Sequence, residues 1–210
     1  MKIVAVNGSA RRDWNTGKVL NSAVEGAVSA GAEVEVFNLY DLDYKGCRSC
    51  FECKRKGGES YGKCVCRDGL TELLEKAREA DGLILASPIY FSEVSGEMKS
   101  FLERLMFPAL QYDLKHMYNW PKKAKAAFIY VLGSRSFEFC KAAPTLSVDG
   151  NLAPYFTSYE TLVVEDTYQF PDYSQYYAPM FSEKLKKKRL DTQFPKDLEK
   201  AFDLGKRMAE

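Results

Sequence analysis

The segment from Asn7 to Gly17 combines the residue types that proteins use to bind phosphate. It follows the apolar run Ile3–Val6 and leads into a helical pattern, so backbone N–H groups and the positive end of a helix dipole would face a bound anion. Ser9 and Thr16 add hydroxyl donors, and Arg11 and Arg12 add positive charge. We therefore expect a phosphate-binding loop. The alternative is that these residues only cap an ordinary turn.

The same loop differs from the fingerprints of two nucleotide-binding classes. It lacks the Lys-Ser/Thr ending of a nucleoside-triphosphate P-loop, and its glycines do not follow the Gly-x-Gly-x-x-Gly spacing of dinucleotide sites. A Mg-nucleotide or a dinucleotide fingerprint is therefore disfavoured.

A second segment, Ser87–Gly96, follows another apolar run and could hold a flat ring system. Pro88 stiffens the backbone, and the groups just after it can offer fixed N–H and C=O partners. Tyr90 and Phe91 offer planar apolar surface, which a heteroaromatic ring requires. The alternative is a hydrophobic strand end that packs on the helix that follows.

A cluster of thiols forms the third candidate site. Five of the six cysteines lie between Cys47 and Cys66, in the pattern Cys47-x2-Cys50-x2-Cys53 followed by Cys64-x-Cys66. Thiolates at every third position of a compact loop can bind several irons of one cluster, which gives a [4Fe-4S] cluster on Cys47, Cys50, Cys53 and Cys64. A structural zinc site and a loop of reduced thiols without metal are the alternatives.

Strand patterns alternate with helical patterns along the chain. The strands are expected at Lys2–Val6, Glu33–Leu39, Gly82–Ala86, Ala126–Leu132 and Tyr159–Glu165. The helices are expected at Lys18–Ala30, Leu70–Ala80, Gly96–Phe107, roughly Phe137–Tyr159, and Pro195–Met208. This alternation predicts an α/β fold, a flavodoxin-like doubly wound five-stranded parallel sheet of order 2-1-3-4-5 with helices on both faces. Such sheets bind ligands beyond the carboxyl ends of their strands, which is where both candidate loops lie.

Composition and charge limit the class of protein. The chain of 210 residues has a net charge of +1, which does not favour nucleic acid or an anionic membrane as a partner. No apolar stretch is long enough for a signal peptide or a membrane span. In a reducing compartment, clustered cysteines suggest metal or redox use over structural disulfides. We expect a cytoplasmic protein with no nucleic-acid and no membrane partner.

We predict one flavodoxin-like domain over residues 1–210 with two additions. A cysteine-rich insertion is expected at about 40–68 and an aromatic-rich C-terminal extension at about 167–210. The stretches Phe107–Lys125 and Thr167–Arg189 are expected to be irregular. The aromatic side chains of the second stretch should cover a partner subunit or a ligand, or else cap one edge of the sheet within the monomer.

Taken together, these motifs resemble those of a known family, the flavodoxin-like NAD(P)H-dependent FMN reductases, and in particular its iron–sulfur flavoprotein branch. The resemblance runs from Met1 to about Gly133 and is carried by Gly8-Ser9-x-Arg11…Asn15-Thr16, by Ser87-Pro88-Ile89-Tyr90-Phe91…Ser95-Gly96-x-Met98-Lys99, and by the cysteine motif. The sequence departs from that branch in the ten-residue gap between Cys53 and Cys64, which is longer than usual, and in the extra thiol of Cys66.

The resemblance implies FMN as the cofactor and NAD(P)H as the reductant. It implies that the phosphate is held by Ser9, Arg11, Asn15, Thr16 and Gly17, that the isoalloxazine is lined by Pro88, Ile89, Tyr90 and Phe91, and that the loop at Gly133 closes the pocket. It also implies a homodimer or homotetramer with flavin sites near subunit contacts.

The function that we expect is an FMN-dependent oxidoreductase that takes electrons from NAD(P)H, or from a reduced ferredoxin-like partner, and passes them to a small molecule or a protein. The chemistry would be carried by FMN, with no catalytic side chain. The alternatives are a flavodoxin-type electron carrier, which is usually acidic, an iron–sulfur flavoprotein without pyridine-nucleotide activity, and an interaction module built on the cysteine loop.

Three further features are expected to have no catalytic role. His116 should be a surface or packing residue, because no partner for general-base catalysis can be identified. The basic run Lys184–Arg189 could contact phosphate, but such runs are usually solvated faces, which is what we expect here. Cys140 should be a buried apolar residue.

Overall fold

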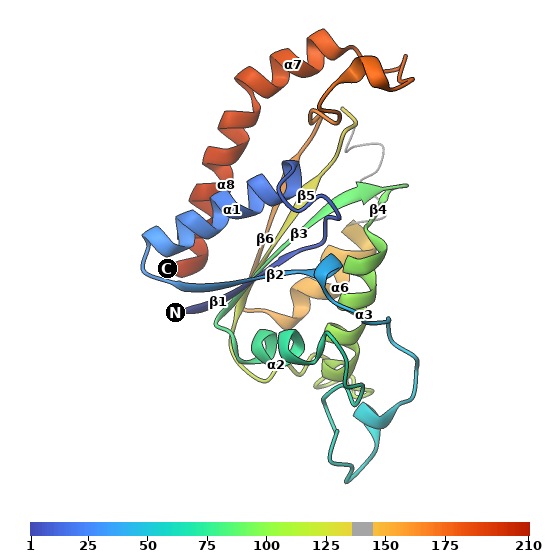
Figure 1. Cartoon of the computed structure of the whole chain (residues 1–210). Helices are drawn as coiled ribbons and strands as arrows, with labels where there is room; N and C mark the ends of the chain where they lie inside the picture. The colour runs from blue at the N-terminus through green and yellow to red at the C-terminus, as the bar shows by residue number, and fades with distance from the viewer. Residues whose placement is uncertain (136–144) are drawn as a thin grey trace.

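The computed structural model describes residues 1–135 and 145–210. Its centre is a sheet in which five parallel strands follow the order β2-β1-β3-β5-β6, and β4 adds to β3 in antiparallel pairing (Figure 1). The strands are β1 Lys2–Asn7, β2 Glu33–Asn38, β3 Gly82–Tyr90, β4 Glu93–Val94, β5 Lys125–Val131 and β6 Ser158–Val164. The predicted order 2-1-3-4-5 is confirmed, because β5 and β6 are the fourth and fifth predicted strands.

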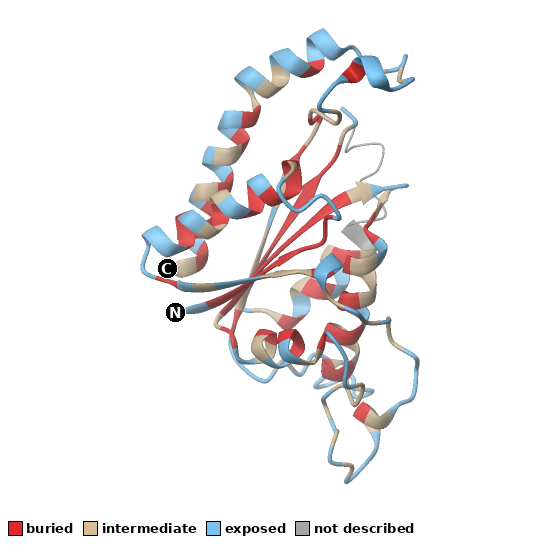
Figure 2. Cartoon of the chain, viewed as in Figure 1, coloured by how far each residue is buried: buried red, intermediate tan, exposed pale blue. Residues whose placement is uncertain are grey.

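Alternating side chains of the central strands enter two separate cores. Val4 of β1 contributes to the core beneath α2 and α3, whereas its neighbour Ala5 contributes to the core beneath α1 and α8. The strands are therefore buried on both faces, as Figure 2 shows, which is what their continuous apolar runs predict.

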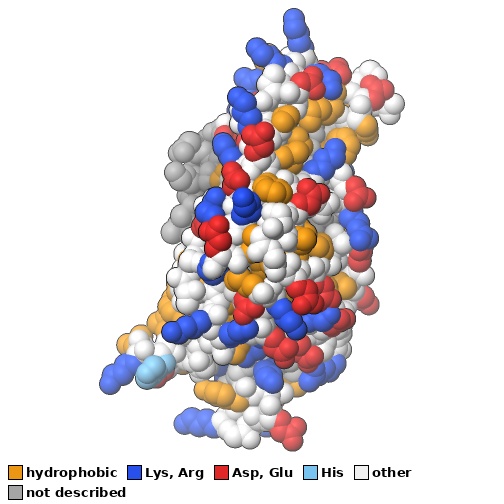
Figure 3. All heavy atoms as spheres, turned by 90° about the vertical axis from the view of Figure 1, so that its left-hand side faces the viewer, with side chains coloured by type: hydrophobic (Ala, Val, Ile, Leu, Met, Phe, Trp, Pro, Cys, Tyr) orange, Lys and Arg blue, Asp and Glu red, His pale blue; other side chains and the backbone are white. Residues whose placement is uncertain are grey.

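Helices cover both faces of the sheet, α1 and α8 on one side and α2, α3 and α6 on the other (Figure 1). Their bounds are α1 Asn15–Ser29, α2 Thr71–Glu79, α3 Gly96–Ala109, α6 Gly150–Leu152, α7 Glu183–Thr192 and α8 Phe194–Ala209. The described part of the chain holds no helix that is both long enough and apolar enough to cross a membrane. Lys and Arg side chains are interspersed with Asp and Glu over the face of α1 and α8, in keeping with the small net charge (Figure 3).

Three of the predicted stretches differ from the structure. The predicted helix that ends at Tyr159 is wrong at its end, because short helical turns finish at Tyr155 and β6 begins at Ser158. Pro154 interrupts the helix, and Tyr159 instead pairs with Ala126 of β5. The start of that predicted helix, like Cys140, lies outside the described residues.

The third strand is longer than predicted. Residues after Ala86 continue β3, because Ser87 and Pro88 pair with Tyr130 and Val131 of β5 and the strand then turns into β4. The expected loop is therefore a strand end with a tight hairpin.

The prediction that the stretch 167–189 is irregular is wrong for its last part. Its last part forms α7, which begins at Ser182, whose Oγ accepts a hydrogen bond from the Leu185 N–H. The cysteine-rich segment after β2, in contrast, contains only short 3-10 turns at Leu39–Asp41 and Glu52–Lys54 and extends from the body of the molecule (Figure 1).

Candidate functional site

The first turn of α1 presents free backbone donors to the end of β1. The helix begins after Trp14 without a side-chain cap, so Asn15 and Thr16 do not cap it and lie inside its first turn. Among the described residues, no acceptor binds the backbone N–H groups of Asn15, Thr16 or Gly17, although all three residues are buried. A buried helix N-terminus with free N–H groups suits an anion.

The loop before α1 is held in a fixed shape that leaves these donors free. The Ser9 N–H donates to Asn7 Oδ1 at 3.0 Å, and the Arg11 N–H donates to Ser9 Oγ at 3.2 Å. A Cβ on Gly17 would lie 1.8 Å from the Arg12 carbonyl oxygen, so the loop can fold back onto the helix only if position 17 is glycine. The predicted residues Ser9 and Arg11 thus lie in a compact loop that packs against Gly17 in the first turn of α1.

Hydrogen bonds join this loop directly to the end of β3. The Gly8 N–H donates to the Ala86 carbonyl at 2.8 Å, and the Ser95 hydroxyl donates to the Gly8 carbonyl at 2.7 Å. Ser95 is fully buried and its N–H donates to Ser87 Oγ at 3.0 Å. The two predicted loops therefore meet at the carboxyl end of the sheet.

The residues predicted to line a flat ring lie beside this junction, and their exposure to solvent increases along the chain. Pro88 is buried and Ile89 is half-buried, whereas 48% of Tyr90 and all of Phe91 are exposed. Phe91 and Ser92 have φ angles of 49° and 65°, the left-handed region that a non-glycine residue seldom adopts, and they form the hairpin tip. The hairpin thus presents one aromatic side chain fully to solvent.

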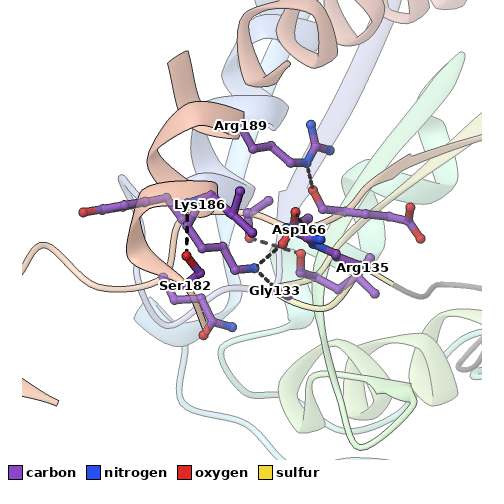
Figure 4. A network of polar contacts seen from close by, with 12 residues as sticks. Gly133, Arg135, Asp166, Ser182, Lys186 and Arg189 are labelled. Carbon is purple, nitrogen blue, oxygen red and sulfur yellow. Dashed lines mark hydrogen bonds and ion pairs between the residues drawn. The ribbon is translucent and has the colours of Figure 1, made fainter. Parts of the chain in front are cut away.

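A third segment, the loop after β5, is fixed by a network that the sequence reading missed (Figure 4). Lys186 of α7 is buried, donates to the Gly133 carbonyl and forms an ion pair with Asp166 at 2.5 Å. Arg135 contacts the other carboxylate oxygen of Asp166 at 3.1 Å.

The prediction that the run Lys184–Arg189 is only a solvated face is therefore wrong at two positions. Lys186 is buried, as above, and Arg189 donates to the Glu165 carbonyl at 2.7 Å. Helical periodicity places these two side chains on the inner face of α7.

The aromatic C-terminal segment lies on the first loop of its own chain. The Tyr168 carbonyl accepts hydrogen bonds from Asn15 Nδ2 at 2.7 Å and from Trp14 Nε1 at 3.2 Å, and Arg11 Nη1 donates to the Gln169 carbonyl at 2.6 Å. The Gln169 amide also fills the space that a Cβ on Gly133 would need. Gln169 thus connects the first loop to the loop after β5, a link that no sequence motif indicates.

The cysteine loop is attached along α3. Tyr44 Oη donates to the Glu97 carbonyl at 2.8 Å near the start of the helix. At the other end, Lys54 Nζ donates to the carbonyls of Phe107, Pro108 and Leu110, so an ammonium group sits at the negative end of the helix dipole. Because Ser95 caps the N-terminus of α3, the helix joins the first candidate site to the cysteine loop over about 20 Å.

All five described cysteines are free thiols, and together they line one narrow cavity, which is also lined by Arg104 and Phe107. The Glu52 N–H lowers the pKa of Cys50, whereas burial raises the pKa of Cys53. In the described residues no three His, Cys, Asp or Glu side chains converge to hold a metal ion. Thiolates are the ligands of structural zinc sites and of iron–sulfur clusters alike, and the five thiols share this cavity.

His116 lies at the surface, as predicted. Its side chain is 78% exposed, and Nδ1 contacts Asp113 at 2.9 Å, three residues earlier in the same loop.

Comparison with known proteins gives a family match and a set of relatives. The family model described as NADPH-dependent FMN reductase matches residues 1–142. An iron–sulfur flavoprotein of Methanocaldococcus jannaschii is 36% identical over 104 residues, which is 50% of this chain and 51% of that protein. An iron–sulfur flavoprotein of Archaeoglobus fulgidus is 36% identical over 119 residues, 57% of this chain and 52% of that protein. The chain thus spans about half the length of these relatives.

Solved structures share the fold at low sequence identity. An NAD(P)H:quinone oxidoreductase from Methanothermobacter marburgensis superposes with a TM-score of 0.71 at 16% identity, covering 99% of this chain and 98% of that one. An azoreductase from Bacillus anthracis gives 0.67 at 15% identity and covers 99% of each chain. At these identities the likeness establishes the flavodoxin-like fold alone.

Proposed function

This chain belongs to the NADPH-dependent FMN reductase family, and from that membership we propose that it is an FMN-dependent oxidoreductase. It takes electrons from NAD(P)H, or from a reduced ferredoxin-like partner, and delivers them to a small-molecule or protein acceptor. When bound, FMN supplies a ring system that accepts a hydride and passes on one or two electrons.

One observation carries this proposal. The loop before α1, the end of β3 and the loop after β5 meet beside backbone N–H groups of α1 that have no acceptor in the described chain. The first turn of α1 offers buried N–H groups without acceptors in the described chain, and Gly8 is bonded directly to Ala86 and Ser95 of the second segment. Gln169 joins the same loop to Gly133. These features fit a ligand with a phosphate at one end and a flat ring at the other.

Each predicted residue has a task in this arrangement. The N–H groups of Asn15, Thr16 and Gly17 would bind the phosphate, with Ser9 beside them. The side chains of Arg11 and Asn15 instead hold the 168–169 backbone over the loop, so they would position the lid of the site and contact the phosphate less directly.

The ring would lie against the hairpin at the end of β3. Pro88 and Ile89 would form its apolar wall, the half-exposed Tyr90 would border it, and Gly133 would close the opposite side. The exposed ring of Phe91 would contact the pyridine nucleotide, the acceptor or a second subunit.

The cysteine loop supports a second part of the proposal, a [4Fe-4S] cluster on Cys47, Cys50, Cys53 and Cys64. Its thiols share one cavity, and the relatives from M. jannaschii and A. fulgidus are named iron–sulfur flavoproteins. Free thiols at all five described cysteines also suit the reducing cytoplasm, where we place the protein.

We further infer that the chain forms a homodimer or homotetramer. Tyr177 and Met180 of the aromatic segment are 98% and 83% exposed, and such large apolar side chains would be covered by a second copy. Sedimentation at micromolar concentration should give a mass above that of one chain, and a monomer at all concentrations would contradict this inference.

Anaerobic mixing of FMN-loaded protein with NADH and with NADPH tests the main proposal. We expect the flavin absorbance to bleach with at least one of them, and bleaching should be lost in Gly17→Ala, whose Cβ would meet the Arg12 carbonyl. Glu25→Ala, an exposed change on the same helix, serves as the control and should bleach normally. Bound flavin that bleaches with neither nucleotide would rule out the pyridine-nucleotide route.

A further inference from the structure

The side chain of Arg104 joins the two ends of the cysteine loop beside its cavity. This residue lies on α3, and its side chain is only 1% exposed. One guanidinium nitrogen, Nη1, contacts Asp68 at 2.5 Å and donates to the Lys45 carbonyl at 3.1 Å, and the other, Nη2, donates to the Cys66 carbonyl at 3.1 Å. One buried side chain therefore holds both the beginning and the end of the cysteine loop.

A third guanidinium nitrogen of Arg104, Nε, has no partner among the described residues. Its Nε–H is buried and makes no hydrogen bond within the described part of the chain, although Arg104 lines the same cavity as the cysteines. A buried donor without an acceptor destabilises the folded state, so its presence at the wall of a thiol cavity calls for a partner. Sulfur atoms of the cysteines, or of a cluster that they hold, are the acceptors that this cavity offers.

We propose that Arg104 is the positioning residue of the cysteine site: it fixes both ends of the loop on α3 and donates its free Nε–H to a sulfur of the bound cluster. This inference rests on the cluster part of the proposed function. Hydrogen bonds to sulfur and nearby positive charge stabilise the reduced, more negative state of such a cluster, so Arg104 raises its reduction potential.

The test compares Arg104→Met, Arg104→Lys and a matched control, Arg67→Met. Arg67 belongs to the same loop, but its side chain is 71% exposed and pairs with Glu75 at the surface. Arg104→Lys keeps the charge but, as a single point donor, cannot reach three partners at once. Each protein is loaded with FMN and reconstituted anaerobically with iron and sulfide.

Three readouts are measured: iron per chain, the rate of iron release to a chelator, and the midpoint potential of the cluster followed by electron paramagnetic resonance. For Arg104→Met we expect iron release at least tenfold faster than in the wild type. We also expect a tenfold shift of the one-electron equilibrium toward the oxidised cluster, which corresponds to a potential 59 mV lower. Arg104→Lys should give values of iron release and midpoint potential between those of the wild type and Arg104→Met. Arg67→Met should match the wild type within twofold.

Bound FMN, read from its own absorbance, reports folding independently of the cluster. The inference is overturned if Arg104→Met keeps the iron content, release rate and potential of the wild type. It is also overturned if wild-type protein that binds FMN takes up no iron, a result that would leave the FMN-dependent function standing. Failure of the wild type to bind FMN would contradict the proposed function, while the iron measurements would still test Arg104.

Discussion

Replacing Lys186 with methionine should destabilise the protein far more than its position in a basic run suggests. The Lys186 side chain is 4% exposed and pairs at 2.5 Å with Asp166, whose side chain is 11% exposed. Removing one partner of a buried ion pair costs about 3–5 kcal/mol, because the other charge is left without compensation. Arg135 still contacts Asp166 at 3.1 Å, but its side chain is 64% exposed, so we expect about 3 kcal/mol, at the lower end of that range.

The same change should weaken FMN binding. Lys186 also donates to the Gly133 carbonyl, so the loop that closes the proposed pocket loses an anchor to α7. We expect FMN affinity to fall about tenfold, which corresponds to roughly 1.4 kcal/mol. Urea unfolding of the FMN-free protein and quenching of FMN fluorescence measure the two effects separately.

Lys187→Met is the matched control for this experiment. Its side chain is 56% exposed and pairs with Asp191 four residues later on the surface of α7, a contact worth about 0.3–0.5 kcal/mol. If Lys186→Met and Lys187→Met differ by less than about 1 kcal/mol in unfolding free energy, the reasoning from burial is refuted. The double variant Lys186→Met with Asp166→Asn should recover part of the loss, because no buried charge is then left unpaired; Arg135 loses its partner but is 64% exposed.

Three further predictions concern other parts of the molecule. Ser95→Ala should cost about 1–3 kcal/mol in urea unfolding and weaken FMN binding, because the buried hydroxyl caps α3 and holds Gly8; an unchanged unfolding midpoint would contradict this. Burial and then the neighbouring Tyr118 raise the pKa of Tyr155 to about 12, so its neutral form favours the folded state. The contribution of Tyr155 to the free energy of unfolding should be fully present below pH ~10 and should decline by at most about 3 kcal/mol as the pH rises toward 12. In alkaline unfolding curves, Tyr155→Phe should therefore lose less stability over that range than the wild type. Cys64→Ser should abolish iron uptake during anaerobic reconstitution, whereas Cys66→Ser should retain it; the reverse result would assign Cys66 as the fourth ligand.

The order of the sheet could be predicted from sequence because each parallel strand is a short apolar run between helical patterns. The run at Gly82–Ala86 revealed β3 in this way. Its extension to Tyr90 could not be foreseen, because Pro88 suggests a break, whereas the pairing of its backbone with Val131 keeps it in the sheet. Tertiary pairing here overrides the local preference.

The C-terminal part shows where sequence reasoning stops. The helix α7 has little apolar periodicity, and it depends on the Ser182 cap and on ion pairs that become visible only after folding. Lys186 and Asp166 are far from any motif, and their pairing joins α7 to the segment after β6. Asp166 also adopts a φ of 55°, a conformation that composition does not predict.

The loops of the candidate site were identified from residue types, but the contacts between them were not. Spacing placed the loops near Ser9 and Pro88 at the same edge of the sheet, because parallel strands end together. The hydrogen bonds from Ser95 to Gly8 and from Arg11 to Gln169 depend on where distant segments cross. One sequence without relatives aligned to it carries no signal for such contacts.

The most direct test of the account is the flavin content of the protein itself. The visible spectrum of freshly purified, anaerobic protein, followed by titration of the flavin-free form with FMN, measures whether the three loops hold this cofactor. We predict a flavin spectrum and saturation at about one FMN per chain, as expected for a single site. Colourless protein that stays colourless after incubation with excess FMN would contradict the central claim.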